Sequence, residues 1–257
     1  MSEYLFDGLS VLKGRINDAK SIVIFLDYDG TLVGFRNNPM EARPSGDVIN
    51  VLKKILETPR INTFIITGRN PEHIKSFLPL KDLKFICIHG FIMDFADFRM
   101  DIPEEDKKII GRIYEDVKKE FSDLVSDMNK KEDIGINFNY RSYKGDKEDL
   151  RRRFIEIVKR HDAEGKLRIM DLSECINVLS KNWDKGKAVN FVLEKHAPKD
   201  ALPIYFGDDV TDEDAFQVLV DKGITVYVKN DDARETKADF FVKDPDEALR
   251  ALEELFN

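Results

Sequence analysis

SIVIFLDYDGTLV, residues 21–33, is the stretch that decides the fold of this chain. The run IVIFL is wholly apolar, which is typical of a parallel strand buried on both faces. Asp27 and Asp29 stand at its end, where a Gly-Thr pair then turns the chain. A turn favours Asp and Gly by itself. The buried strand in front of it favours a functional site, because open α/β sheets bind ligands at the carboxyl ends of their strands.

Helices alternate with two further buried strands before residue 91. NTFIITG (62–68) and KFICIHG (84–90) have the same apolar character as the first strand. The sequence predicts a helix before each of them, one capped by Ser45 and one that begins with Asn70 as cap and a proline in its first turn. Strands that alternate with helices indicate right-handed βαβ units and a parallel sheet.

The middle of the chain has a different pattern. Apolar residues at helical spacing predict a long helix over 104–128, and DKEDLRRRFIEIVKR (146–160) predicts a second, charged helix. GINFNYRSY (135–143) alternates apolar and polar residues, as a half-exposed antiparallel strand does. Residues 167–181 carry one or two more strands. This order predicts a compact α+β insertion.

The first pattern resumes after Trp183. Helices are predicted at 184–196, at 212–223, where Gly223 ends the helix, and at 244–256, and strands at 203–207, 224–228 and 239–242. We therefore predict an α/β protein with a Rossmann-like parallel-sheet core made of residues 1–100 and 180–257. Residues 101–179 are expected to form an inserted α+β cap, or lid, domain.

The charge and the apolar runs exclude several classes of partner. The 257-residue chain has a formal net charge of −8, which argues against nucleic acid because little would drive counterion release from a phosphate backbone. A small anionic substrate is still possible, since local cations and a metal decide its binding. No apolar run is long enough to cross a bilayer, and the first fifteen residues lack the features of a signal peptide. We expect no membrane partner and a cytoplasmic location.

Cysteine usage and helix patterning add two expectations. Cys87 and Cys175 lie in apolar segments, where we expect reduced thiols that pack as small hydrophobic groups. No exposed heptad run indicates a coiled coil, and we expect a monomer.

Asp27 and Asp29 have the chemistry of a nucleophile and a proton donor. Two carboxylates this close repel each other unless a cation or a shared proton offsets the repulsion. With Mg²⁺ present, one carboxylate can attack phosphorus while the other exchanges a proton with the leaving oxygen. The pair predicts a Mg²⁺-dependent phosphatase in which one of the two aspartates forms a transient phosphoryl ester.

The second buried strand ends in a group of residues suited to phosphate. The Thr67 hydroxyl can donate to a phosphate oxygen, Gly68 lets the backbone approach closely and Arg69 supplies charge. The alternative is an ordinary turn that leads to the helix cap at Asn70.

WDKGKAV (183–189) offers a second cation. Asp184 is expected to cap a helix, which places Lys185 at the positive end of the helix dipole, where it suits an anion. The alternative is an ordinary surface lysine, and Lys187 is the member of the pair expected to face solvent.

YFGDDVTDEDAF (205–216) concentrates acids after another short strand. The normal preference of a first helical turn for acids explains Asp212 to Asp214, but not the doublet Asp208-Asp209 at a strand end. Oxygen ligands without a nearby His or Cys favour Mg²⁺ over Zn²⁺. The acids that follow this strand are therefore expected to bind a metal ion, with Asp208 and Asp209 as the strongest candidates.

The order of these motifs resembles the haloacid dehalogenase superfamily of phosphatases. More narrowly, DYDGTL, TGR, the His89-Gly90 pair, NWDKGKAV and GDDVTDEDAF resemble the trehalose-6-phosphate phosphatases, over most of residues 20–100 and 180–257. The resemblance implies a nucleophile at Asp27 and a general acid/base at Asp29. It implies that Asp27, the backbone carbonyl of Asp29 and Asp208 hold Mg²⁺, with Asp209 and Asp212 in support, and that Thr67 and Lys185 bind phosphoryl oxygens.

The cap departs from the pattern of that family. Tyr140-Arg141 is present, but Ser126 and Met128 occupy the places of a family Glu and Lys, and Asn177 or a neighbour occupies the place of a later acid. Those family residues hold sugar hydroxyls. The candidate substrate residues here are His89, Arg141, Lys144, Glu174, Asn177 and Lys181, with a solvated surface charge or a structural histidine as the alternative for each.

The leading hypothesis is hydrolysis of a phosphorylated sugar, with trehalose 6-phosphate as the first candidate, to trehalose and phosphate. Because the cap departs from the family pattern, another glycosyl phosphate is a second candidate, of the sucrose phosphate or glycosyl-phosphoglycerate type. A third is a switch protein that accepts a phosphoryl group for signalling. A catalytically inactive partner subunit of a sugar synthase is a further alternative, against which the intact acids argue.

Overall fold

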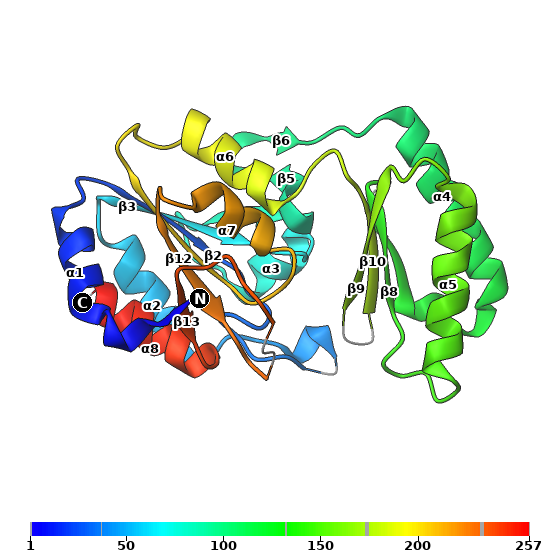
Figure 1. The fold of residues 1–257 in the computed structure, drawn as a ribbon, viewed down its shortest axis with the longest axis horizontal. Helices are drawn as coiled ribbons and strands as arrows, with labels where there is room; N and C mark the ends of the chain where they lie inside the picture. Colours follow the sequence, from blue (N-terminus) through cyan, green and yellow to red (C-terminus); the bar gives the residue numbers. More distant parts are fainter. Residues whose placement is uncertain (1, 37, 132, 173–174, 232–233, 257) are drawn as a thin grey trace. The chain divides into compact units, whose positions relative to one another are not determined.

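The computed structural model describes residues 2–36, 38–131, 133–172, 175–231 and 234–256. The chain divides into two compact units. The core unit consists of Met1–Arg99 and Asp184–Asn257, and the inserted unit of Met100–Trp183. Among the described residues, the helices are too short or too polar to cross a membrane. The predicted fold class, α/β with a parallel-sheet core and an α+β insertion, is confirmed (Figure 1).

A largely parallel sheet forms the centre of the core unit. The strand order is β1 (Glu3–Tyr4), β13 (Phe240–Val242), β12 (Ile224–Val228), β11 (Leu202–Gly207), β2 (Ile22–Leu26), β3 (Ile61–Ile66), β4 (Lys84–Cys87), β5 (Ile92–Met93) and β6 (Phe98–Arg99). In this order, all neighbouring strands from β1 to β4 are parallel. The last two strands, β5 and β6, pair in antiparallel fashion.

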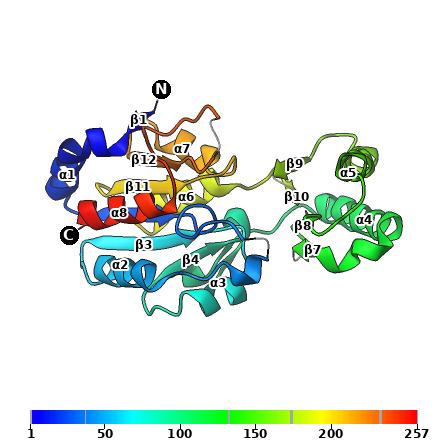
Figure 2. The same ribbon diagram turned by 90° about the horizontal axis from the view of Figure 1, so that it is seen from below.

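Helices cover both faces of this sheet. On one side lie α2 (Gly46–Leu56) and α3 (Pro71–Phe77), and α2 packs against α8 (Pro245–Phe256), which contacts α1 (Leu9–Asp18). On the other side α6 (Lys185–Lys195) packs against α7 (Glu213–Leu219), as Figure 2 shows. All five residues of β2 are buried, as expected for a strand covered on both faces.

The connections on the two sides of β2 run in opposite directions across the sheet. The chain leaves β2 for α2 and β3 on one side, and returns through α6 to β11 on the other. Connections that run in opposite directions from one strand open a crevice at its carboxyl end, which is where open α/β sheets bind ligands. Asp27 is the residue that follows β2.

The predicted helix caps are present. The Ser45 hydroxyl accepts from the backbone N–H of Val48 at 3.3 Å, and the Asn70 side chain accepts from His73 N–H at 2.9 Å. The Asp184 carboxylate accepts from Lys187 N–H at 2.8 Å. Each cap supplies an acceptor to an otherwise unpaired donor of the first turn, and so fixes where its helix begins.

The inserted unit is an antiparallel sheet with helices on one face. The strand order is β7 (Met128–Lys131), β8 (Gly135–Asn139), β10 (Cys175–Ser180) and β9 (Leu167–Leu172). The Phe138 ring of β8 stacks on Phe154 of α5 (Lys147–His161) at 5.2 Å, and contacts Phe121, just after α4 (Glu104–Glu120), at 5.7 Å. Because strand side chains alternate, Asn137 and its cross-strand partner Asn177 lie on the opposite face.

Two predicted helices are shorter than expected. The helix expected over 104–128 ends at Glu120, because Phe121 leaves the helical conformation, with φ −119° and ψ 48°, and its ring contacts Phe138. A 3₁₀ segment and β7 follow. The helix expected over 212–223 ends at Leu219. Val220 has a non-helical ψ of 132°, and the N–H of Gly223 donates back to the Leu219 carbonyl at 3.1 Å. Both cysteines are free thiols, as predicted.

Candidate active site

Three parallel strands bring the principal site residues together. The backbone N–H of Asp27 donates to the Phe206 carbonyl of β11 at 2.9 Å. This bond extends the backbone ladder between β2 and β11 to Asp27. Thr67 follows β3 and Asp208 follows β11, the two strands that flank β2. All three residues are at least 95% buried. The prediction that strand ends assemble the site therefore agrees with the positions of these residues.

Lys185 contacts the nucleophile candidate directly. Its Nζ lies 2.8 Å from Asp27 Oδ1 and 2.7 Å from Asp212 Oδ1, and its side chain is 2% exposed. Burial disfavours the ammonium, but Asp212 and Asp27 more than offset this and hold the pKa of Lys185 above its ordinary value. The surface alternative for Lys185 is wrong, and a fixed positive charge stands beside Asp27.

Asp212 organises the turn that follows β11. Its Oδ1 accepts from Lys185 and from the Tyr205 hydroxyl at 2.5 Å, and its Oδ2 accepts from the N–H groups of Asp208 and Asp209 at 3.1 and 2.9 Å. Four donors therefore surround one fully buried carboxylate. This arrangement fixes the positions of Lys185 and of the Asp208 backbone.

Asp208 lies in a strongly acidic environment. One oxygen from each of Asp27, Asp208 and Asp212 lies within 4.8 Å of the others. Burial, and then repulsion from Asp27 and Asp212, raise the pKa of Asp208 well above its ordinary value, and the Thr31 hydroxyl opposes this by donating to Oδ1 at 2.9 Å. Gly30 is required beside it: at its φ of +87°, a Cβ would stand 2.1 Å from Asp208 Oδ2.

The Asp27 carboxyl is also destabilised as an anion. Burial raises the pKa of Asp27 to about 7, Lys185 opposes the rise, and Asp212 adds to it. Buried like charges at such separations need a compensating cation or a proton. The acidic cluster of Asp27, Asp208 and Asp212 is therefore suited to hold a metal ion.

Asp29 is not in that cluster, because its carboxylate pairs with Arg69. Arg69 Nε lies 2.7 Å from Asp29 Oδ2, and a terminal nitrogen lies 2.6 Å from Oδ1. The same terminal nitrogen donates to the Pro39 carbonyl at 2.7 Å. Arg69, predicted to serve a phosphate, thus contacts the predicted proton donor.

His89 explains why residue 68 is glycine. A Cβ on Gly68 would stand 2.6 Å from Cε1 and Nε2 of the buried His89 ring. The His89 N–H donates to the Thr67 carbonyl at 2.9 Å, and Thr67 Oγ1 accepts from Arg69 N–H at 3.2 Å. His89 and the β-branched Ile88 both have left-handed φ angles, of 53° and 48°. Such backbone strain, on the order of 1–3 kcal/mol per residue, is concentrated at functional sites.

Three contributing residues were missed by the sequence reasoning. Thr31 donates to Asp208, Tyr205 donates to Asp212, and Arg234 donates to the Asp208 carbonyl and lies 3.7 Å from an Asp209 oxygen. Thr31 belongs to the DYDGT segment (27–31), so its position in that motif could have identified it as a site residue. Tyr205 resembles any aromatic residue of a buried strand, and Arg234 follows a polar run of sequence, so neither carried a signal.

The remaining metal candidate, Asp209, lies at the edge of the acidic turn. Its Oδ1 accepts from Val210 N–H at 2.7 Å, and burial, then repulsion from Asp212, raises its pKa.

The candidate substrate residues of the insertion are placed as follows. Asn177 is 3% exposed, and its Oδ1 accepts from Asn137 Nδ2 at 2.9 Å. The N–H of Arg141 donates to the Asn139 side chain at 3.1 Å, and Lys181 Nζ donates to the Gly165 carbonyl at 2.6 Å. Lys144 is exposed. Glu174 lies outside the described residues.

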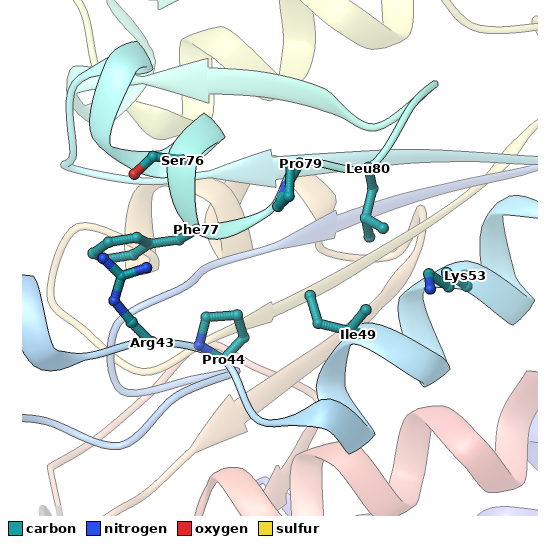
Figure 3. Close-up of a pocket in the computed structure, with 8 residues that line it drawn as sticks. All are labelled: Arg43, Pro44, Ile49, Lys53, Ser76, Phe77, Pro79 and Leu80. Carbon is teal, nitrogen blue, oxygen red and sulfur yellow. The ribbon is translucent and has the colours of Figure 1, made fainter.

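A hollow on the surface of the core unit is separate from these acids. Figure 3 shows this pocket of about 400 Å³ beside α2 and α3. Its lining is Arg43, Pro44, Ile49, Lys53, Ser76, Phe77, Pro79 and Leu80. None of them is a candidate site residue.

Comparisons with known proteins point to one family. The model of the trehalose-phosphatase family matches residues 25–246. "Probable trehalose-phosphate phosphatase E" of Arabidopsis thaliana is 28% identical over 260 residues, which cover 93% of this chain and 71% of the relative. A "Trehalose-6-phosphate phosphatase-related protein" of Thermoplasma acidophilum is 32% identical over 236 residues, covering 90% and 95%.

Solved structures show the same fold. The C-terminal domain of the C. albicans trehalose-6-phosphate phosphatase has a TM-score of 0.81 at 20% identity, covering 100% of this chain and 98% of that one. A haloacid dehalogenase-like hydrolase from Bacteroides thetaiotaomicron has a TM-score of 0.65 at 16% identity, covering 91% and 99%. The family model spans most of the chain and includes the acids after β2 and β11. This chain therefore belongs to the trehalose-phosphatase family and is a phosphatase.

Proposed function

We propose that this phosphatase hydrolyses trehalose 6-phosphate to trehalose and phosphate through a phosphoryl ester on Asp27, with Mg²⁺ as its metal. The observation that carries the mechanism is the position of Asp27 at the end of β2, held by Lys185 at 2.8 Å inside an acidic cluster. The substrate comes from the printed names of the relatives, which are trehalose-phosphate phosphatases.

In the first step, a carboxylate oxygen of Asp27 attacks phosphorus and the bond from phosphorus to the sugar oxygen breaks. Asp29 gives its proton to that oxygen, and the sugar leaves. In the second step, Asp29 takes a proton from water, whose oxygen attacks phosphorus and displaces the Asp27 carboxylate. Lys185 touches Asp27 and stays charged, so it can bind a phosphoryl oxygen there, and the Thr67 hydroxyl lies on the adjacent strand end.

The residues present fit a divalent metal. Asp27 and Asp208 are buried carboxylates whose oxygens approach each other and Asp212 within 4.8 Å. The pKa of Asp208 is raised by burial and by like charge, which is the condition that a cation relieves. Oxygen-only donors favour Mg²⁺, with Asp27, Asp208 and the Asp29 carbonyl as its ligands. When bound, the ion neutralises carboxylate and phosphoryl charge.

Asp212 fits the role of a supporting residue. Both of its oxygens are already taken by Lys185, Tyr205 and two backbone N–H groups. We therefore assign it to orienting Lys185 and the turn that carries Asp208.

The identity of the sugar depends on the insertion. The sheet face opposite its helices carries the carboxamides of Asn137, Asn139 and Asn177. Carboxamides both donate to and accept from hydroxyl groups, so these residues, with Arg141, are our candidates for sugar contacts. Another glycosyl phosphate, such as sucrose phosphate, would use the same groups. The monomeric state and the cytoplasmic location remain predictions from the sequence.

Phosphate release from trehalose 6-phosphate, with Mg²⁺ and with EDTA, tests the proposal. Asp27→Asn should lower turnover by at least about 10³-fold, because the amide is a poor nucleophile. Asp18→Asn, at an exposed position of α1, is the matched control and should leave the rate unchanged. Full turnover by Asp27→Asn, or full activity in EDTA, would contradict the mechanism.

A panel of sugar phosphates tests the substrate. The highest kcat/KM is expected for trehalose 6-phosphate. A higher kcat/KM for sucrose phosphate or a glycosyl phosphoglycerate would show that trehalose 6-phosphate is not the preferred substrate. The proposed mechanism would not be affected. A phosphoryl ester on Asp27 that accumulates without release of phosphate would instead favour the switch protein.

A further inference from the structure

We infer that Arg69 is a positioning residue for Asp29 and not a ligand of the phosphoryl group. The inference rests on the proposed function, since it assigns Asp29 the proton transfer. It differs from the expectation of the sequence, which placed Arg69 with Thr67 and Gly68 on the phosphate.

The contacts of Arg69 leave little of it for a phosphate. Of the five N–H donors of a guanidinium, one on Nε and one on a terminal nitrogen bind the two oxygens of Asp29. The second donor of that terminal nitrogen binds the Pro39 carbonyl at 2.7 Å. The side chain is 8% exposed. A bidentate pair of this kind fixes the plane as well as the position of the carboxylate.

Aromatic rings hold the guanidinium in that orientation. Its carbon lies 5.3 Å from the centroid of Tyr28 and 4.9 Å from that of Phe77. Both rings are buried, and the Tyr28 hydroxyl donates to the Ala42 carbonyl at 2.7 Å. Turning Arg69 toward a phosphate would break two charged hydrogen bonds and these ring contacts together.

Lys185 already supplies the cation at the nucleophile, whereas Asp29 has no contact with it. Lys185 and Arg69 therefore have separate partners: Lys185 pairs with Asp27 and Asp212, and Arg69 pairs with Asp29. The pair with Arg69 fixes the orientation in which the Asp29 carboxyl group can meet the water that hydrolyses phosphoryl-Asp27. Loss of the Arg69–Asp29 contact should slow hydrolysis of phosphoryl-Asp27, by on the order of 10–100-fold if the Asp29 carboxyl group shifts by about 1 Å.

Steady-state kinetics on two substrates separates the two roles. p-Nitrophenyl phosphate has a leaving group that needs no proton, so its kcat/KM reports phosphoryl binding and attack by Asp27 alone. For Arg69→Gln we expect kcat to fall about 10–100-fold with both this substrate and trehalose 6-phosphate. We expect kcat/KM for p-nitrophenyl phosphate to stay within about threefold of wild type, so that KM falls with kcat. The inhibition constant of inorganic phosphate should not change.

A phosphate-binding role predicts the opposite pattern. In that case kcat/KM for p-nitrophenyl phosphate would fall, KM would rise and inorganic phosphate would inhibit more weakly; that result would overturn the inference. Arg69→Lys keeps the charge but not the two-pronged geometry. It should resemble Arg69→Gln in kcat, and recovery of wild-type kcat by Lys would also count against a positioning role.

Two further variants exclude a general effect on folding. Arg43 lies 4.9 Å from the same Phe77 ring (Figure 3), is exposed and has no contact with Asp29. Arg43→Gln should therefore keep wild-type kinetics. In the background of Asp29→Asn, adding Arg69→Gln should change kcat by less than about twofold, because the residue it acts through is gone. A further large loss there would refute action through Asp29, whereas failure of the proposed function itself would appear as unchanged turnover in Asp27→Asn.

Discussion

Replacement of Asp208 by Asn should stabilise the metal-free protein and remove its response to Mg²⁺. Asp208 is 5% exposed and is surrounded by acids, and its Oδ1 accepts from Thr31. Asparagine has the same shape and keeps the acceptor oxygen that Thr31 needs. The substitution therefore removes a charge without removing a contact. Most substitutions of a buried polar residue would instead destabilise the fold.

The size of the effect follows from the separations. At 4.8 Å and an effective dielectric constant of about 20, two like charges repel by roughly 3.5 kcal/mol. Lys185 offsets part of this through Asp27 and Asp212. The metal-free protein can also keep Asp208 protonated, which at about pH 7 costs at most about 4 kcal/mol relative to an ordinary carboxyl with a pKa of 3.8. We expect a gain of about 1–4 kcal/mol, or roughly 2–15 °C in Tm for a chain of this length.

Thermal unfolding followed by circular dichroism, with EDTA and with MgCl₂, measures both parts of this prediction. Asp239→Asn is the matched control, because Asp239 accepts from the N–H and hydroxyl of Thr225 and lies outside the acidic cluster. That control should not raise Tm in EDTA and should keep the wild-type response to Mg²⁺. If Asp208→Asn unfolds in EDTA at or below the wild-type Tm, or still gains stability from Mg²⁺, the reasoning is refuted.

Other substitutions and conditions test the remaining parts of the site. Lys185→Met should lower the free energy of unfolding by about 3–5 kcal/mol in urea titrations, because it leaves two buried carboxylates without their cation; a loss below about 1 kcal/mol would contradict this. Burial raises the pKa of Asp27 to about 7, so between about pH 4 and 7 the folded state holds a proton that the unfolded state has released, and this contribution to stability falls as pH rises. Since a metal binds the carboxylate, the Tm gain from Mg²⁺ should grow over the same window, and scanning fluorimetry showing a constant gain would argue against it. Gly68→Ala should displace the His89 ring and cost about 1–3 kcal/mol with loss of activity, and a variant with wild-type rate and Tm would disprove the close contact.

Strand positions could be predicted because a strand buried on both faces consists of a continuous apolar run. β2, β3 and β4 each fall within an apolar run that ends in a turn. The resemblance of the motifs to a known family implied that Asp27 and Asp208 would meet, although they are 181 positions apart in the chain. A capped helix was expected to begin at Lys185, where the helix dipole suits an anion, and α6 does begin there.

The sequence could not give the elements and contacts that depend on tertiary packing. β1, β5 and β6 are two residues long, too short for any periodicity. The end of α4 depends on Phe121 meeting Phe138, a contact between segments 17 residues apart. The direction of the Arg69 guanidinium depends on the rings of Tyr28 and Phe77. A sequence shows a cation after a strand, but not which of two nearby anions it faces.

The strand order also sets when the catalytic centre can exist during synthesis on the ribosome. β2 can pair with β3 early, but its other neighbour, β11, begins at Leu202. Lys185 emerges 158 residues after Asp27, which at about 5–20 residues per second is a delay of roughly 8–30 s. Over that interval one edge of β2, the most apolar strand of the chain's first part, has no partner, and such an edge readily pairs with other chains. The nascent protein therefore presents a period of vulnerability to aggregation that ends when the last third of the chain closes the sheet.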